Sequence, residues 1–355
     1  MGASLKVWLK LLWDNKFNIS WKYIPRTLAI TLVTALFTPL TIYEHLRFNQ
    51  KVRKTEIKED PIFIIGHWRT GTTHLQNLLL LDEKYGYLDL IEATFPHLML
   101  GSFKLISSLM KPLIPETRPM DNMAMDTTTP QEHDFPIVDL CMLSPQTGLF
   151  FPSNRERYLK YGSFEKATET EINKWKETFL FYLKKLTLKE GGKQLLLKNP
   201  LDTHRVKLIL EIFPNAKFIN IYRNPYEVFF STVKLHKTNT HLFWLQKPEY
   251  KLEDFIFDLY LEMYEKYYKD FDSIPKEQLI EVKYESLISN PMGELVKIFD
   301  QLNLGDFELV RDKIQIYLDS LNDYKVGNYK ISKKDKEFIY SKWHETIDRW
   351  GYEKP

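Results

Sequence analysis

Apolar residues near the start of the chain recur at the spacing of an α-helix, and lysines lie between them. The repeating positions are Leu5, Trp8, Leu9, Leu12 and Trp13. This pattern predicts a basic amphipathic helix. Residues 27–43 then carry no charge, and the length of this run is at the short limit for a membrane-spanning helix. We expect Pro39 to interrupt the run, because proline breaks the hydrogen-bond ladder of a helix.

The charge pattern separates this N-terminal part from the rest of the chain. Residues 51–60 are densely charged and predict a solvated linker. The apolar run starts late and is followed by Glu44, His45 and Arg47, so it does not fit a cleaved signal peptide. We therefore expect residues 1–58 to form a helical extension. Two interpretations stay open: helices docked on the main domain, or an anchor at a membrane surface.

Four short apolar runs predict buried strands, at 62–65, 195–197, 217–222 and 279–282. Helices are predicted over 72–81 and 205–212, the second of them between two of these strands. A strand-helix-strand crossover joins parallel strands. These elements predict an α/β fold with a central parallel sheet flanked by helices. Residues 85–190 are irregular to helical, and we interpret them as excursions that build a substrate pocket.

The segment between the first strand and its helix predicts an anion site. It reads Gly-x-x-x-x-Gly, from Gly66 to Gly71, and Thr72 and Thr73 follow. Backbone N–H groups and the N-terminus of a helix favour phosphate at such a turn. A nucleoside triphosphatase has lysine where Thr72 stands, and no later strand ends in the aspartate that would hold magnesium. The cation of this loop is Arg69, so we expect arginine rather than a metal ion to balance the charge of the ligand.

A second anion site is predicted where another strand ends. Arg223 follows the strand at 217–222, and Asn224-Pro225 begins a helix. Ser231 lies about two helical turns further on. An arginine and a hydroxyl placed in this way can bind one phosphate together. Two separate anion sites imply a ligand with two separated phosphate groups.

Residues 61–75 and 218–231 together resemble the sulfotransferase family that uses 3′-phosphoadenosine 5′-phosphosulfate. Residues 196–200 and 282–291 resemble two further elements of this family, its strand-end lysine and its C-terminal strand and helix. The sequence Arg-Thr-Gly-Thr-Thr is most similar to the bacterial and tyrosylprotein branches. The resemblance implies the P-loop-like sulfotransferase fold for residues 59–355, with sulfuryl transfer to a hydroxyl acceptor as the activity.

The resemblance also implies which residues bind the co-substrate. In the family the first loop binds the 5′-phosphosulfate and the second element binds the 3′-phosphate. A basic loop near the C-terminus often closes over the nucleotide. Transferred to this sequence, the implied binding residues are Arg69, Thr70, Gly71, Thr72, Thr73, Arg223, Ser231 and Lys330.

Sulfuryl transfer builds negative charge on the bridging oxygen of the donor and needs a base for the acceptor hydroxyl. Arg69 and Lys198 are the candidate cations, and Lys198 should lie at the carboxyl edge of the sheet. One candidate base is Glu92, whose apolar neighbours predict a raised pKa and whose place resembles the catalytic glutamate of the tyrosylprotein and carbohydrate branches. The other is His133, which lies between two acids and should titrate near neutrality. The cytosolic branch has its catalytic histidine where Pro200 stands here, so both candidates stay open.

Composition disfavours several other kinds of protein. The 49 Lys and Arg residues nearly balance the 47 Asp and Glu residues, so no nucleic-acid partner is expected. A single cysteine excludes a disulfide framework, and the histidines lack metal-ligand spacing, so no metal is expected. One cysteine and one glycosylation sequon favour a cytoplasmic location. A nucleotide kinase and an inactive nucleotide-binding protein are the remaining alternatives.

The acceptor is expected to be a lipophilic alcohol, with a sterol or a membrane lipid as the first choice. Residues 95–125 are rich in methionine and other apolar residues, which suit an adaptable pocket. Residues 1–43 are a candidate for peripheral contact with the inner face of the membrane. A carbohydrate, phenol or peptide acceptor is the alternative. No feature of the sequence predicts the oligomeric state.

Overall fold

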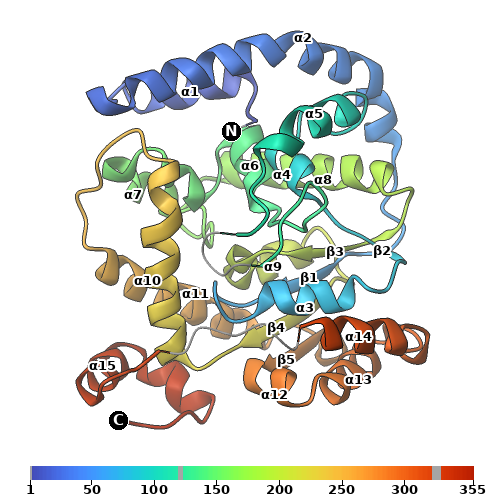
Figure 1. Ribbon diagram of the computed structural model, residues 1–355, viewed down its shortest axis with the longest axis vertical. Helices are drawn as coiled ribbons and strands as arrows, with labels where there is room; N and C mark the ends of the chain where they lie inside the picture. Colours follow the sequence, from blue (N-terminus) through green and yellow to red (C-terminus); the bar gives the residue numbers. More distant parts are fainter. Residues whose placement is uncertain (1, 119–122, 322–328) are drawn as a thin grey trace. The chain divides into compact units, whose positions relative to one another are not determined.

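The computed structural model describes residues 2–118, 123–321 and 329–355 (Figure 1). Five strands form one sheet in the order β2-β3-β1-β4-β5. Their bounds are Ile62–Ile65 for β1, Tyr85–Gly86 for β2, Gln194–Lys198 for β3, Lys217–Tyr222 for β4 and Leu279–Lys283 for β5. The prediction of an α/β fold with a central parallel sheet is confirmed.

The register of three strands places their apolar residues side by side. β1 pairs in parallel with β4, and β4 pairs in parallel with β5. Ile64 lies opposite Ile219, which lies opposite Ile280. All of β1 and the interior of β4 are buried, as expected for a parallel sheet with helices on both faces. The four predicted strands are confirmed, whereas β2 is too short to show a hydrophobic pattern in the sequence.

The chain divides into two compact units. Unit 1 contains Met1–Glu59, Gly86–Leu197 and Asn239–Tyr250. Unit 2 contains Asp60–Tyr85, Lys198–Thr238 and Lys251–Pro355. The N-terminal residues therefore group with most of the excursion at 85–190.

Unit 1 is largely helical in its described part. Its helices are α1 (Leu5–Asp14), η1 (Trp21–Tyr23), α2 (Ile24–Lys54), α4 (Leu90–Thr94), α5 (Phe103–Met110), η2 (Lys111–Leu113), α6 (Asp134–Cys141), η3 (Pro145–Leu149), η4 (Pro152–Asn154), α7 (Glu156–Leu159), α8 (Glu169–Lys189) and η6 (Thr240–Leu242). The sequence of α8 explains its start, because Thr168 and Glu171 form a reciprocal capping box there.

Unit 2 carries β1, β4 and β5 together with the helices that follow them. These helices are α3 (Thr72–Leu79), η5 (Pro200–His204), α9 (Val206–Leu210), α10 (Pro225–Asn239), α11 (Leu252–Phe271), η7 (Lys276–Gln278), α12 (Tyr284–Ser289), α13 (Pro291–Gln301), α14 (Glu308–Ser320) and α15 (Lys333–Arg349). Asn290 caps α13 and Ser332 caps α15 through their side chains, which accept from backbone N–H groups of the first turn.

The predicted interruption at Pro39 is wrong, because α2 runs unbroken from Ile24 to Lys54. A helix of 31 residues loses one backbone donor at the proline, and Pro39 lies on its exposed face, where the ring has room. The helix also takes in residues 51–54. The charged linker therefore begins at Thr55 rather than at residue 51.

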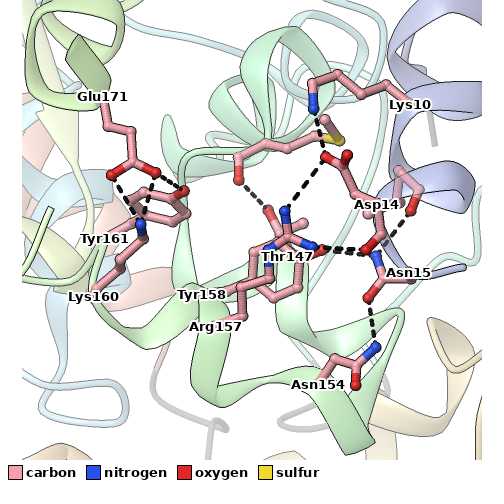
Figure 2. A network of polar contacts seen from close by, with 12 residues as sticks. Lys10, Asp14, Asn15, Thr147, Asn154, Arg157, Tyr158, Lys160, Tyr161 and Glu171 are labelled. Carbon is pink, nitrogen blue, oxygen red and sulfur yellow. Dashed lines mark hydrogen bonds and ion pairs between the residues drawn. The ribbon is translucent and has the colours of Figure 1, made fainter. Parts of the chain in front are cut away.

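The helix α1 packs within unit 1 through apolar and polar contacts. Its buried side chains are Trp8, Leu11 and Leu12. The indole Nε1 of Trp8 donates to Thr31 Oγ1 of α2 at 2.8 Å. Directly after α1, the buried Asn15 side chain donates to the Tyr158 hydroxyl at 2.7 Å and accepts from Asn154 at 2.9 Å (Figure 2). One face of the N-terminal segment is thus docked on its own unit.

Candidate functional site

The predicted phosphate loop lies in unit 2 between β1 and α3. Gly66 has a φ of 126° and Gly71 a φ of 105°, so both adopt backbone conformations that favour glycine. A side chain at Gly66 would also overlap with the carbonyl of Ile221, and one at Gly71 with the ring of Tyr284. Gly71 is the N-cap of α3 and no side chain caps this end. The first turn of α3 therefore offers backbone N–H groups and the positive end of the helix dipole to an anion.

Hydrogen bonds from neighbouring segments of unit 2 fix the shape of this loop. The N–H of Gly66 donates to Thr203 Oγ1 at 2.8 Å, and the N–H of His67 donates to the Tyr264 hydroxyl at 3.1 Å. Within the loop, Thr70 Oγ1 donates to the carbonyl of His67 at 2.8 Å. Burial lowers the pKa of His67 to about 3, so this imidazole is neutral at physiological pH. The loop is thus organised by its own unit before any ligand binds.

The structure brings the first and second predicted anion elements together. Arg69 Nε donates to Ser231 Oγ of α10 at 2.9 Å, and Arg223 Nη1 donates to the carbonyl of Arg69 at 3.4 Å. Arg69 and Ser231 are far apart in the sequence, but the parallel pairing of β1 and β4 places both elements at the carboxyl edge of the sheet. Two guanidinium groups and one hydroxyl therefore gather beside the start of α3.

The guanidinium of Arg223 is almost buried, with 7% of the residue exposed. Its Nη2 forms a close ion pair with Glu227, one helical turn into α10. The same guanidinium stacks over the ring of Tyr284, 4.5 Å from the centroid. These contacts hold the arginine in one orientation, and Glu227 competes with any anionic ligand for its charge.

Lys198 is the last residue of β3 and is buried. The next residue, Asn199, donates its N–H to the carbonyl of Ile64 in β1, at 3.2 Å. Thr203, four residues later, accepts from the phosphate loop. Lys198 therefore lies on a segment that is hydrogen-bonded directly to β1 and its loop. His204, on the same segment, is buried and its pKa is lowered to about 4 by burial, so it is not a cation there.

Glu92 lies in unit 1, on the short helix α4, and is buried. It forms a capping box with Asp89: Glu92 N–H donates to Asp89 Oδ1 at 2.8 Å, and Asp89 N–H donates to Glu92 Oε2 at 2.7 Å. Glu92 also forms a close ion pair with Lys189. Burial and the neighbouring charge of Asp89 raise its pKa to about 7, as the apolar neighbours in the sequence predict. Glu92 therefore also stabilises the start of α4, and the spacing Asp-x-x-Glu in the sequence indicates this capping box.

His133 lies in unit 1 at the start of α6 and is buried rather than solvated. Its ring packs on Phe179 of α8, with 5.3 Å between the centroids. Lys330, in unit 2, is exposed. The neighbouring Tyr329 stacks on Phe230 of α10, with 6.1 Å between the centroids. Residues 322–328, which precede Tyr329, lie outside the described residues.

Unit 1 contains an apolar cavity of about 200 Å³. Its lining residues are Leu90, Ala93, Thr94, Gln131, Phe135, Val138, Asp139, Gln146, Leu149, Phe150 and Phe243. The methionine-rich stretch predicted to form a pocket does not line it. Phe95 and Leu98 pack instead into a core cluster with Ile91 and Ile106. Methionine content in the sequence therefore does not distinguish a cavity wall from a core.

No group of three His, Cys, Asp or Glu side chains is arranged to hold a metal ion among the residues that the structure describes. The single cysteine, Cys141, is free and half-buried. Burial raises its pKa to about 11, so it is a thiol rather than a nucleophilic thiolate at neutral pH.

Comparison with known proteins gives a consistent result. The model of the Sulfotransferase family matches residues 61–308. An omega-hydroxy-beta-dihydromenaquinone-9 sulfotransferase, Stf3, of Mycobacterium tuberculosis (strain CDC 1551 / Oshkosh) is 32% identical over 355 residues, which is 100% of this chain and 91% of the relative. The protein of the same name from Mycobacterium bovis has the same identity and coverage.

Two solved structures share the fold. Sulfotransferase STF9 from Mycobacterium avium aligns with a TM-score of 0.72 and 16% identity, covering 100% of this chain and 98% of that one. Sulfotransferase STF1 from Mycobacterium tuberculosis H37Rv aligns with a TM-score of 0.69 and 16% identity, covering 96% of this chain and 90% of that one.

Proposed function

Because the chain belongs to the sulfotransferase family, we propose that it transfers a sulfuryl group from 3′-phosphoadenosine 5′-phosphosulfate to the hydroxyl group of a lipophilic acceptor. The observation that carries this proposal is the contact of Arg69 with Ser231 and of Arg223 with the Arg69 carbonyl. A ligand with one phosphate would need only one of these elements. Residues 59–355 would carry the reaction, and residues 1–58 would be accessory.

Each group of the donor has candidate partners in unit 2. The 5′-phosphosulfate would bind the loop, through Arg69, the backbone of Thr70 and Gly71, and the hydroxyls of Thr72 and Thr73. The 3′-phosphate would bind Arg223 and Ser231, which are linked through Arg69: its Nε donates to Ser231 and its carbonyl accepts from Arg223. Lys330 would lie over the nucleotide. This assignment of residues to the groups of the donor is based on the family resemblance and on the geometry of the loop.

In the reaction, the acceptor oxygen forms a bond to sulfur while the bond from sulfur to the bridging oxygen breaks. 3′-Phosphoadenosine 5′-phosphate leaves, and its 5′-phosphate gains one negative charge on the former bridging oxygen, which Arg69 and Lys198 would neutralise. The proton of the acceptor hydroxyl passes to a base. Glu92 fits this role because a carboxylate with a pKa near 7 is partly ionised at neutral pH and accepts a proton readily. His133 is the second candidate.

The class of acceptor follows from two observations. The relative that is 32% identical is named for an omega-hydroxy-dihydromenaquinone, a lipophilic compound with a hydroxyl group. The cavity in unit 1 has phenylalanine, leucine and valine side chains in its wall, which suit a hydrocarbon chain. A carbohydrate, phenol or peptide acceptor has less support, because this wall carries one ionisable side chain, Asp139. The enzyme would work in the cytoplasm, where the donor is made, with residues 1–43 in contact with the membrane.

The nature of the donor can be tested separately from the acceptor. Radiolabelled phosphosulfate and ATP labelled on its terminal phosphate are offered with a mixture of lipid alcohols, once with magnesium and once with EDTA. We expect label from the phosphosulfate alone in the product, because Thr72 replaces the lysine of phosphoryl-transferring loops. Transfer from ATP that EDTA abolishes would show a kinase instead, and tight binding without any transfer would show an inactive nucleotide-binding protein.

A further inference from the structure

The inner face of α2 carries several polar side chains beside apolar ones such as Phe37 and Leu40, which is unusual for a helix of a soluble domain. Thr27, Thr34 and Glu44 are buried, and Thr31 and Thr38 are half-buried. The threonine hydroxyls donate to carbonyls one turn back on the same helix, for example Thr31 to Thr27 at 2.8 Å and Thr38 to Thr34 at 2.9 Å. A row of such polar side chains normally points to solvent. In α2 it points into unit 1.

The opposite face of α2 is apolar and exposed. Leu28, Leu32 and Leu36 are 64%, 61% and 65% exposed. The other exposed residues between positions 24 and 46 are Ile24, Pro25, Ala29, Val33, Ala35, Pro39, Ile42, Tyr43, His45 and Leu46. Apart from His45, every exposed side chain in this described stretch is apolar. Leaving such a surface in water is costly, so the surface needs a partner.

A second exposed apolar row lies on the neighbouring α5 and η2 of the same unit. Leu105, Leu109 and Leu113 are spaced four residues apart and are exposed. The inner faces of α2 and α5 pack on one core cluster, to which Phe37 of α2 and Phe103 of α5 contribute. Figure 1 shows the two helices side by side at this place. The two rows therefore belong to one apolar surface of unit 1.

Most charged side chains of these segments are basic. Residues 2–54 carry nine Lys and Arg side chains and two carboxylates. Asp14 accepts from Lys10 at 2.5 Å, and Glu44 is buried against Lys185 at 2.9 Å. In α5 and η2, Lys104 and Lys111 are exposed and there is no acidic residue. Such an arrangement complements a layer of anionic lipid head groups above an apolar interior.

The buried face of α2 decides how the helix meets a bilayer. Glu44 accepts from the backbone N–H groups of Leu100 at 2.8 Å, Gly101 at 3.0 Å and Ser102 at 3.3 Å, besides its ion pair with Lys185. The stretch Trp21–Lys54 is long and apolar enough to cross a membrane by length and composition. If α2 crossed the membrane, the Glu44 carboxylate would lose these partners and lie in hydrocarbon. If α2 lies in the interface, all these bonds remain intact.

We propose that the exposed faces of α2 and of α5 with η2 form a monotopic docking surface for an anionic lipid bilayer, with α2 lying in the plane of the interface. This proposal deepens the proposed function, because a lipophilic acceptor resides in the same bilayer. It adds α5 and η2 to the surface and excludes a spanning helix. Binding to vesicles needs neither donor nor acceptor, so the surface can be tested without the reaction.

The first test is sedimentation of the full-length protein with vesicles of phosphatidylglycerol and phosphatidylcholine. We expect binding that weakens in pure phosphatidylcholine and in high salt. Replacing Leu28, Leu32 and Leu36 together by serine should lower the partition coefficient at least about tenfold, and the triple change Leu105→Ser, Leu109→Ser and Leu113→Ser should also lower it. All six side chains are exposed, so folding should be retained, which thermal melting checks.

The matched control changes equally exposed apolar residues of unit 2. Leu309 and Ile316 of α14 are 78% and 70% exposed, and Leu309→Ser with Ile316→Ser should leave vesicle binding unchanged. Equal losses in the control and in the α2 variant would overturn the proposal. So would the absence of vesicle binding. Light scattering gives a third outcome. If the wild type is a dimer, the α2 variant is a monomer and neither protein binds vesicles, the surface is the contact with a second copy of this chain.

The second test measures depth. Spin labels at Leu28→Cys, Leu36→Cys and Leu46→Cys are compared in a Cys141→Ser background. The first and last of these positions are about 27 Å apart along a helix. An in-plane helix gives the three labels similar, shallow depths. A steady change of depth from one end to the other would show a spanning helix and overturn the in-plane mode. Sulfation of a short soluble alcohol, measured in parallel, should be the same in the wild type and in the α2 serine variant. If the wild type does not sulfate this alcohol, the proposed reaction is wrong, but the proposed membrane-docking surface is not affected.

Discussion

Replacing Arg223 by alanine should remove most of the preference for a nucleotide with a 3′-phosphate. The arginine is almost buried, and its Nη1 lies 3.4 Å from the carbonyl of Arg69 in the phosphate loop. A charged hydrogen-bond partner lost from such a site costs about 2–4 kcal/mol of binding free energy, which corresponds to about 30- to 1,000-fold in affinity. The lower end applies if Ser231 and Arg69 compensate.

The assay compares two nucleotides by calorimetry, so that general damage to the site is separated from loss of one contact. 3′-Phosphoadenosine 5′-phosphate carries both phosphates, whereas adenosine 5′-phosphate lacks the one assigned to Arg223. In the wild type, the first should bind more tightly by the factor above. In Arg223→Ala the two affinities should converge, with that for adenosine 5′-phosphate nearly unchanged.

A matched variant should change affinity in the opposite direction. Glu227 pairs with Arg223 and is about one-third exposed, so the pair is screened by solvent. Glu227→Gln removes the competitor for the guanidinium and should strengthen binding of the doubly phosphorylated nucleotide about two- to fivefold, without affecting the singly phosphorylated one. If Arg223→Ala keeps the wild-type ratio between the two nucleotides, the assignment of the 3′-phosphate to Arg223 is wrong.

Three other changes test the reaction and the acceptor. Glu92→Gln should lower turnover at least about 10²-fold and leave nucleotide affinity nearly unchanged. Because a base acts when deprotonated and the pKa of Glu92 is raised to about 7, wild-type kcat/KM should rise with pH through that value. If His133→Ala abolishes turnover and Glu92→Gln has only a mild effect, His133 is the base. Lys198→Met should lower kcat with little change in donor affinity, measured by single turnover; an effect on donor affinity alone would place this lysine outside the bond-breaking step. Val138→Trp, which fills the cavity of unit 1, should raise KM for a long-chain alcohol and leave that for a short soluble alcohol unchanged; equal effects on both would exclude the cavity as the site of the chain.

The features that the sequence predicts well are those with a dense local signal. The runs 62–65 and 217–222 consist almost wholly of residues that favour buried strands, and the structure places strands there. The position of both anion elements at one edge of the sheet was predictable. Both follow strands of a parallel sheet, and the carboxyl ends of such strands share one edge. The direct contact of Arg69 with Ser231, which lie 162 positions apart, was not predictable, because the sequence assigns them to two separate sites.

Features that depend on tertiary packing were not predictable in the same way. Phe243 joins the wall of the cavity from a segment far along the chain, and no local pattern links it to Leu90. Pro39 signals a break, but a long helix with room around the proline continues through it. The exposure of the apolar face of α2 could not be predicted from periodicity. Amphipathicity shows that the two faces of a helix differ, but it does not show which face packs against the protein.

One measurement decides between a lipid-alcohol sulfotransferase and the other members of this enzyme class. The purified full-length chain is given radiolabelled phosphosulfate, with EDTA, and a panel of isoprenoid and quinol alcohols, sterols, phenols, sugars and tyrosine peptides at equal concentration. We predict that a long-chain lipophilic alcohol has the highest kcat/KM, and that Arg69→Ala abolishes transfer to it. Preferential labelling of a sugar or a peptide, or no transfer of label to any hydroxyl, would contradict the proposed function.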